Sequence, residues 1–252
     1  MAGIFRVFFL AAMLSSSGSK AFASDVVFDF SEGKWDKSAW KYLKVWPYKL
    51  HVPEFKLETV AFTQEKDCLS VGFPKESVDS GDDNALMITD CLKASGEVVM
   101  EFEADGGRVT APGICLFPSY GDDLVLQKGI AVFVASYTMA VWQVELDNVE
   151  KITRYKLLGM TVKWFDPSVR HTLRCRFGGN DVAVSLDGSD PAYYWLQPWL
   201  PPFKDGAAKS CEPVKANAGI GIWGCHGRCK FYSLKVLDKP TLKLAAEKPA
   251  QN

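Results

Sequence analysis

The feature that most constrains the fold of this chain is a series of twelve short runs rich in β-branched and aromatic residues. Clusters of Gly, Pro, Asn and Asp separate most of these runs, which is typical of β-strands joined by turns. No stretch shows the apolar spacing of an amphipathic helix of three or more turns. The pattern therefore predicts an all-β protein.

Alternation of apolar and polar side chains within these runs indicates half-buried strands. The segment 98–103 shows it most clearly, because its side chains divide at period two into an apolar set and a largely acidic set. The two sets are Val98, Met100 and Phe102, and Val99, Glu101 and Glu103. Strands of this kind, following one another closely along the chain, predict two antiparallel sheets packed as a sandwich.

The first 23 residues have the pattern of a secretory signal peptide. They contain a basic start with Arg6, an apolar core over residues 7–14 and small residues ending at Ala23. We therefore expect cleavage after Ala23 and a secreted or periplasmic protein. One β-sandwich domain is expected over residues 24–238, since sandwiches of roughly 200–250 residues are common. A disordered tail is expected over residues 239–252.

Charge and hydropathy argue against a nucleic-acid partner and against a membrane span. Without residues 1–23 the chain keeps 27 basic and 30 acidic residues, so it has no excess of cations for a phosphate backbone. A nucleic-acid partner is therefore not expected. The apolar core of the signal peptide is shorter than the ~20 residues that span a bilayer, and no later segment approaches that length. No membrane span is expected.

Three segments resemble the concanavalin A-like lectin and glucanase superfamily. Residues 169–189, VRHTLRCRFGGNDVAVSLDGS, are similar to a strand, turn and strand of laminin G-like modules and 3-keto-disaccharide hydrolase-like domains. Residues 217–237 resemble the closing hairpin of these jelly rolls, and residues 95–107 resemble a central strand. The resemblance implies a two-sheet antiparallel jelly-roll sandwich with a carbohydrate partner. This fold serves lectins, adhesion modules and glycosidases alike.

An acidic motif is formed by Glu145, Asp147 and Glu150. Its spacing resembles the E-x-D-x-x-E signature of secreted laminarinases and lichenases, which would make Glu145 the nucleophile, Asp147 a positioning group and Glu150 the general acid/base. A retaining glycosidase needs its two working carboxyls ~5–5.5 Å apart, and a β-bulge would have to bring Glu150 to the face of the other two. The alternative, which we favour, is a hairpin turn at Asp147 and Asn148.

The aromatic segment 192–203, AYYWLQPWLPPF, is the candidate ligand-binding feature. Its prolines and its place between two predicted strands indicate a surface loop. Rings held by a stiff backbone can stack on the apolar face of a sugar at low ordering cost. The expected platform consists of Tyr193, Tyr194, Trp195 and Trp199. The alternative is that the loop folds back and buries its rings.

Seven cysteines in an exported chain predict disulfides rather than metal sites, and their odd number leaves at least one thiol free. In the segment CHGRC, a three-residue hairpin loop would bring Cys225 and Cys229 within bridging distance. Cys211 is the alternative partner. A zinc site made by Cys225, His226 and Cys229 is disfavoured, because the tetrahedral ligand set is incomplete.

The loop DSGDDN, residues 79–84, is rich in oxygen ligands, and calcium is common in the superfamily that the chain resembles. The loop lacks the spacing of a recognised calcium site. No metal or other cofactor is therefore expected, and calcium at this loop stays an alternative.

These features predict an exported β-sandwich that binds glycans, most simply as a non-catalytic carbohydrate-recognition module. Two alternatives remain open. One is a glycoside-cleaving enzyme, either β-glucanase-like or 3-keto-disaccharide hydrolase-like. The other is a structural or adhesion module.

Overall fold

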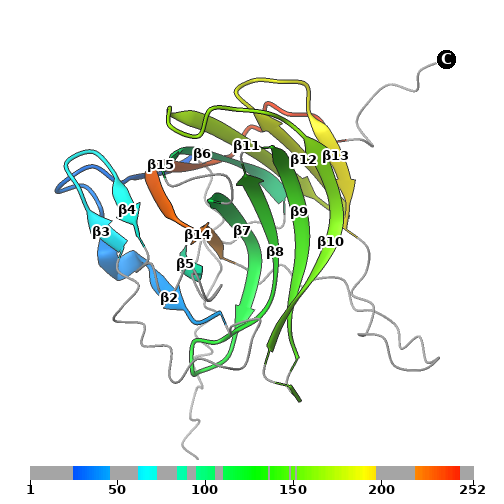
Figure 1. Ribbon diagram of the computed structural model, residues 1–252, viewed down its shortest axis with the longest axis horizontal. Coiled ribbons are helices and arrows are strands. Elements are labelled where there is room, and N and C mark those ends of the chain that lie inside the picture. The colour runs from blue at the N-terminus through cyan, green and yellow to red at the C-terminus, as the bar shows by residue number, and fades with distance from the viewer. Residues whose placement is uncertain are drawn as a thin grey trace, which may run out of the picture.

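The computed structural model describes residues 25–45, 62–72, 84–89, 95–105, 110–135, 137–147, 149–150, 152–196 and 219–244. In these ranges the chain forms fifteen β-strands and one short 3-10 helix, η1 (Lys37–Ala39). The strands make two antiparallel sheets packed face to face (Figure 1). The predicted all-β sandwich is therefore confirmed. None of the helical structure described here is long and apolar enough to cross a membrane.

The first sheet, called sheet A, has eight strands. Their spatial order is β13-β12-β11-β6-β15-β4-β3, and β1 pairs with β15 outside this path. Their bounds are β1 (Val26–Asp29), β3 (Phe62–Gln64), β4 (Leu69–Val71), β6 (Ser95–Asp105), β11 (His171–Gly178), β12 (Asp181–Leu186), β13 (Ala192–Trp195) and β15 (Arg228–Leu237).

The second sheet, called sheet B, has seven strands in the order β10-β9-β8-β7-β14-β5-β2. Four consecutive strands, β7 to β10, form a meander at one end of it (Figure 1). The bounds are β2 (Lys41–Leu43), β5 (Asn84–Thr89), β7 (Ala111–Tyr120), β8 (Leu126–Ala135), β9 (Thr138–Asp147), β10 (Ile152–Val162) and β14 (Ile220–Cys225).

The main core lies between the two sheets and follows the predicted alternation. On β6, Val98, Met100 and Phe102 are fully buried in this core. Glu101 and Glu103 extend from the other face of the same strand and form ion pairs there. Burial of each large apolar side chain contributes about 1.5–3 kcal/mol, so the inner faces of the sheets hold the sandwich together.

Sheet B carries a second apolar cluster on its outer face. On β14, Ile220 and Ile222 face the main core, and the next residue, Trp223, belongs to the outer cluster. The Trp223 ring packs against Phe133 with 5.2 Å between centroids, and its Nε1–H donates to Asn84 Oδ1 over 3.1 Å. Sheet B is thus apolar on both faces.

The edge strands β10 and β13 close the sandwich along one side. The hydroxyl of Tyr194 on β13 lies 2.8 Å from Oγ1 of Thr161 on β10. Gly159 leaves room for the Tyr194 ring, since a Cβ at this glycine would lie 2.4 Å from ring atom Cδ1. The pairing of β9 and β10 shifts between Leu157 and Gly159, and this bulge places the glycine opposite the ring.

Residues 239–244, which the sequence placed in a disordered tail, are described by the structure and contact sheet A. Thr241 and Leu242 donate backbone hydrogen bonds to Glu97 on β6, and Leu244 is buried. The described structure therefore extends six residues beyond the expected domain boundary at Asp238. We call residues 239–244 the C-terminal strap.

Candidate functional site

The aromatic residues of β13 alternate between the two faces of sheet A. This segment was expected to be a loop, but Ala192–Trp195 pairs with β12 as the edge strand of the sheet. Tyr194 points into the core and is 8% exposed, whereas Trp195 points outward and is 65% exposed. Tyr193 shares the outward face and is half-buried. Of the expected platform, Tyr194 belongs to the core and Trp199 lies outside the described residues.

Trp195 lies directly opposite Asp181 on the neighbouring strand β12. Side chains of such a pair extend from the same face of the sheet with Cβ atoms about 4.5–5.5 Å apart. The Asp181 carboxylate is half-buried and makes no hydrogen bond or ion pair with another described residue. An exposed indole and an available hydrogen-bond acceptor therefore lie side by side. Nothing in the sequence singled out Asp181, because only strand pairing brings it beside Trp195.

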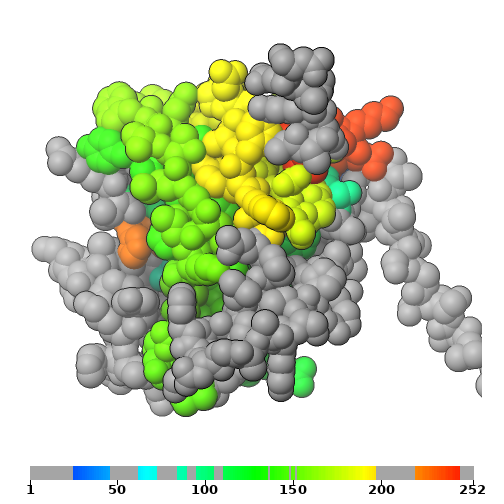
Figure 2. All heavy atoms as spheres, turned by 90° about the vertical axis from the view of Figure 1, so that its right-hand side faces the viewer, coloured from blue at the N-terminus to red at the C-terminus, as the bar shows by residue number. Residues whose placement is uncertain are grey.

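Figure 2 shows this side of the molecule, where the yellow-green surface of β10 adjoins the yellow surface of β12 and β13. Exposed apolar side chains also occur on β10 and just after it. Met160 and Val162 are largely exposed, and Trp164 is 70% exposed on the connection to β11. Trp164 thus matches Trp195 in exposure but lies in a connection rather than on a strand.

The three acids of the E-x-D-x-x-E motif lie at the β9–β10 hairpin. Asp147 Oδ1 accepts hydrogen bonds from the backbone N–H groups of Val149 and Glu150, at 2.9 and 3.0 Å. Arg154 on β10 contacts Asp147 Oδ2 at 2.9 Å and Glu150 Oε2 at 2.8 Å. The hydrogen bond from Glu150 and the Arg154 guanidinium lower the pKa of Asp147. These contacts are those of a turn residue.

Glu145 occupies a different environment from the other two acids. It pairs across the strands with Lys128 on β8 and Arg154 on β10, and its Oε1 lies 3.5 Å from Lys128 Nζ. Because β9 pairs with β8 without a bulge, Glu145 shares a face with Val141 of the main core. The outer face of β9 carries Trp142 and Val144 instead. The motif is therefore not on the aromatic face of sheet B.

The predicted disulfide between Cys225 and Cys229 is not formed. Five cysteines lie in the described residues and are buried without forming a disulfide: Cys68, Cys115, Cys175, Cys225 and Cys229. Cys225 ends β14 in sheet B and Cys229 is the second residue of β15 in sheet A. The CHGRC segment therefore crosses from one sheet to the other instead of closing a hairpin within one sheet. Cys91 and Cys211 lie outside the described residues.

The described residues contain no group of three or more side chains able to hold a metal ion, and the cysteines with His226 do not make one. Of the loop at residues 79–84, only Asn84 is described, and its Oδ1 accepts the hydrogen bond from Trp223. The rest of this calcium candidate lies outside the described residues.

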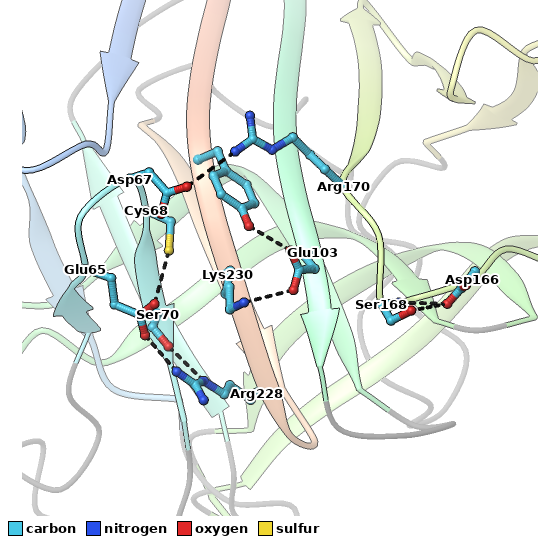
Figure 3. A network of polar contacts seen from close by, with 11 residues as sticks. Glu65, Asp67, Cys68, Ser70, Glu103, Asp166, Ser168, Arg170, Arg228 and Lys230 are labelled. Carbon is cyan, nitrogen blue, oxygen red and sulfur yellow. Dashed lines mark hydrogen bonds and ion pairs between the residues drawn. The ribbon is translucent and has the colours of Figure 1, made fainter.

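A polar network on the outer face of sheet A consists of contacts within the protein (Figure 3). Glu103 accepts hydrogen bonds from Lys230 at 2.9 Å and from the Tyr232 hydroxyl at 2.7 Å. Burial alone would raise the pKa of Glu103, but these two donors hold it below its usual value. Burial and the same hydrogen bond raise the pKa of Tyr232 to about 12. The Arg170 guanidinium stacks 3.5 Å from the centroid of the Tyr232 ring. We therefore interpret the network as structural, since its side chains bind one another across the surface of the sheet.

A buried histidine next to this network has a similar role. His171 Nδ1 lies 2.7 Å from Asp187 Oδ2, and His171 Nε2 lies 2.5 Å from the carbonyl oxygen of Asp166. The ring also packs on Phe102 and Phe165. Both ring nitrogens are engaged, and the residue fastens the β10–β11 connection to the turn after β12.

No family model matches the chain, and no curated protein matches it at a significant level. Solved structures do share its fold. The carbohydrate binding module CBM66 from Bacillus subtilis superposes with a TM-score of 0.51 at 10% identity, over 79% of this chain and 95% of that one. The Bacillus licheniformis beta-glucanase gives a TM-score of 0.53 at 9% identity, over 86% and 99% of the two chains.

A third similar structure is SCLam, a non-specific endo-beta-1,3(4)-glucanase from family GH16. Its TM-score is 0.51 at 14% identity, and the match covers 85% of this chain and 90% of that one. The fold is the concanavalin A-like jelly roll. At these identities the likeness extends to the fold alone, so the functional site of this jelly roll has to be argued from its own residues.

Proposed function

We propose that this chain is an exported, non-catalytic carbohydrate-recognition module that binds a sugar ring between Trp195 and Asp181. The observation that carries the proposal is the pairing of a 65% exposed indole with a carboxylate that no described residue engages. Large exposed aromatic side chains tend to act as anchors at binding sites, and Trp is among the most enriched residues there.

The chemistry of a neutral sugar fits both groups. One face of a pyranose or furanose ring presents C–H bonds, which pack on an indole face and lose contact with water. The hydroxyl groups at the ring edge are donors, and an ionised carboxylate accepts hydrogen bonds at about twice the strength of a neutral acceptor. Because both residues lie on paired strands, little conformational entropy is lost when the ligand binds.

Comparison with other jelly rolls supports a glycan as the ligand, since similar structures include a carbohydrate binding module and glucanases. The contacts of the acids at the β9–β10 hairpin favour glycan binding over glycan cleavage in this proposal. Asp147 is engaged by the turn and by Arg154, and Glu145 forms an ion pair with Lys128. A nucleophile and a general acid/base need carboxyls directed at a common substrate. A glycoside-cleaving enzyme therefore stays the second candidate.

Screening the purified protein on an array of neutral and acidic glycans, followed by titration calorimetry on the hits, tests the proposal. We expect millimolar to micromolar affinity for a neutral oligosaccharide and no release of reducing ends from it. Absence of binding to all arrayed glycans would contradict the proposal. Hydrolysis of a bound glycan would replace it with the enzymatic alternative.

A further inference from the structure

The C-terminal strap (residues 239–244) is fastened to sheet A by one buried carboxylate. Glu97 on β6 is fully buried. Its Oε2 accepts the backbone N–H of Thr241 and, at 2.9 Å, that of Leu242. Its Oε1 accepts from Thr241 Oγ1 at 2.9 Å and from Arg174 Nη1 at 2.8 Å. A buried carboxylate with this set of donors is a strong and directional anchor.

Two further contacts set the course of the strap over sheet A. The Leu242 carbonyl accepts a hydrogen bond from Arg176 Nη1 on β11 at 3.0 Å. Leu244 then lies over Gly178 at the end of β11, where a Cβ on the glycine would be 3.0 Å from Leu244 Cδ1. The strap thus ends on the outer face of sheet A, on a glycine that leaves space for its last apolar side chain.

Strand register places this end of the strap beside the Trp195 site. Gly178 pairs with Asp181, and Asp181 pairs with Trp195, so the three residues form one row across β11, β12 and β13. Neighbouring strands lie about 4.8 Å apart, which makes the distance from β13 to β11 about 10 Å. Trp195 and Leu244 therefore stand at the two ends of a row whose middle is Asp181. A sugar ring placed over Asp181 would lie between these two residues.

We infer that the C-terminal strap is the second wall of the glycan site, with Leu244 in contact with the sugar and Glu97 as the positioning residue that holds the strap in place. This inference rests on the proposed function. It assigns the strap and Glu97 a role in affinity: Glu97 acts through Thr241 and Leu242, whereas Leu244 acts on the ligand directly. Loss of either residue therefore weakens glycan binding for a different reason.

The experiment compares three variants of the full-length protein: Glu97→Gln, Leu244→Ala and Glu101→Gln. Glu101 is the matched control, because it lies on the outward face of β6 but pairs with Arg170 and Lys235 instead of the strap. Amide hydrogen exchange at Thr241 and Leu242 reports whether the strap is held. Calorimetric titration of a neutral oligosaccharide reports affinity, and thermal melting verifies that each variant is folded.

We expect Glu97→Gln to speed exchange at both amides by about tenfold or more and to weaken glycan affinity. Leu244→Ala should weaken affinity roughly tenfold, as for the loss of an apolar contact, and leave the two amides protected. Glu101→Gln should change neither readout. Unchanged exchange in a folded Glu97→Gln protein would overturn the positioning role. Faster exchange in Glu97→Gln with unchanged glycan affinity would contradict the role of the strap as a wall of the glycan site.

The same measurements distinguish failure of the glycan-binding function from failure of the role of the strap. If the wild-type protein binds no glycan, the proposed function fails and the wall fails with it, while amide exchange still decides whether Glu97 holds the strap. If the wild type binds a glycan and Leu244→Ala binds it equally well, the proposed function stands and only the wall is overturned.

Discussion

Tyr194 and Trp195 are adjacent in the chain and face opposite sides of the same edge strand. Tyr194 is 8% exposed and joins β13 to Thr161 of the other sheet, while Trp195 is 65% exposed beside Asp181. The period-two geometry of a strand therefore divides one aromatic segment between the core and the surface. Substitution of Tyr194 should therefore reduce stability, whereas substitution of Trp195 should reduce glycan affinity.

Truncation of Tyr194 should destabilise the sandwich. Tyr194→Ala removes a ring packed against Gly159, and by analogy with other buried aromatics it should lower the free energy of unfolding by about 3–5 kcal/mol. Tyr194→Phe should remove only the hydrogen bonds of the hydroxyl, to Thr161 and to the Met139 carbonyl, each worth about 0.5–1.5 kcal/mol. Urea unfolding measures both. Equal losses for the two variants would contradict the packing role of the ring.

Substitutions of the acids at the β9–β10 hairpin should affect the stability of the protein and no catalytic activity. We expect the wild-type protein and Glu145→Gln to show no turnover of laminarin or lichenan. Asp147→Ala should lower the melting temperature, because it removes the acceptor for two backbone N–H groups and an ion pair with Arg154. Asp147→Asn keeps the Oδ1 acceptor and should lose less. Turnover of laminarin that disappears in Glu145→Gln would instead establish the enzyme.

The sequence was sufficient to predict the fold class, because alternation records which face of a strand is buried. Val98, Met100 and Phe102 occupy the core as the pattern indicated. Alternation also governs residues 192–195, where Pro and the aromatic cluster led to the prediction of a loop. A proline is tolerated close to the end of an edge strand, because no partner strand needs the N–H group that proline lacks. Local composition does not show which strand lies at the edge of a sheet.

Pairing between distant strands was beyond the reach of the sequence. The CHGRC segment has the length of a hairpin loop, but its flanking strands belong to different sheets, and its cysteines do not form the predicted disulfide. Asp181 and Gly178 gain their interest only from the register of β11, β12 and β13. Glu97 gives no local signal of burial, because its partners Thr241 and Leu242 are more than 140 residues away.

Thiol titration tests the cysteine assignment. Denatured, non-reduced protein should yield at least five free thiols, corresponding to the five described cysteines. The native protein should react slowly at pH 8, because burial and the neighbouring Glu65 raise the pKa of Cys68 to about 12 and the other four thiols are buried as well. Fewer than five thiols in the denatured protein would show that described cysteines are bridged.

The anchor of the strap should make stability depend on pH in one direction. Burial opposes ionisation of Glu97, but hydrogen bonds from Leu242, Thr241 and Arg174 lower its pKa below the usual value. A carboxyl with a lowered pKa stabilises the fold above its unfolded pKa, about 4.3, and loses this contribution as the pH falls through its folded pKa. The stability advantage of wild type over Glu97→Gln should therefore be constant from pH 7 to pH 5 and shrink below pH ~4. An advantage unchanged at pH 3 would contradict an ionised anchor.

The central claim is that Trp195 is the sugar platform, and one matched pair of variants tests it most directly. Trp195→Ala and Trp164→Ala each remove an exposed indole, at 65% and 70% exposure, so both should keep the wild-type melting temperature. Calorimetric titration with the neutral oligosaccharide selected from the array should show a loss of about 1–3 kcal/mol of binding free energy in Trp195→Ala. Trp164→Ala should bind as the wild type does. Equal affinity in Trp195→Ala and the wild type would contradict the account.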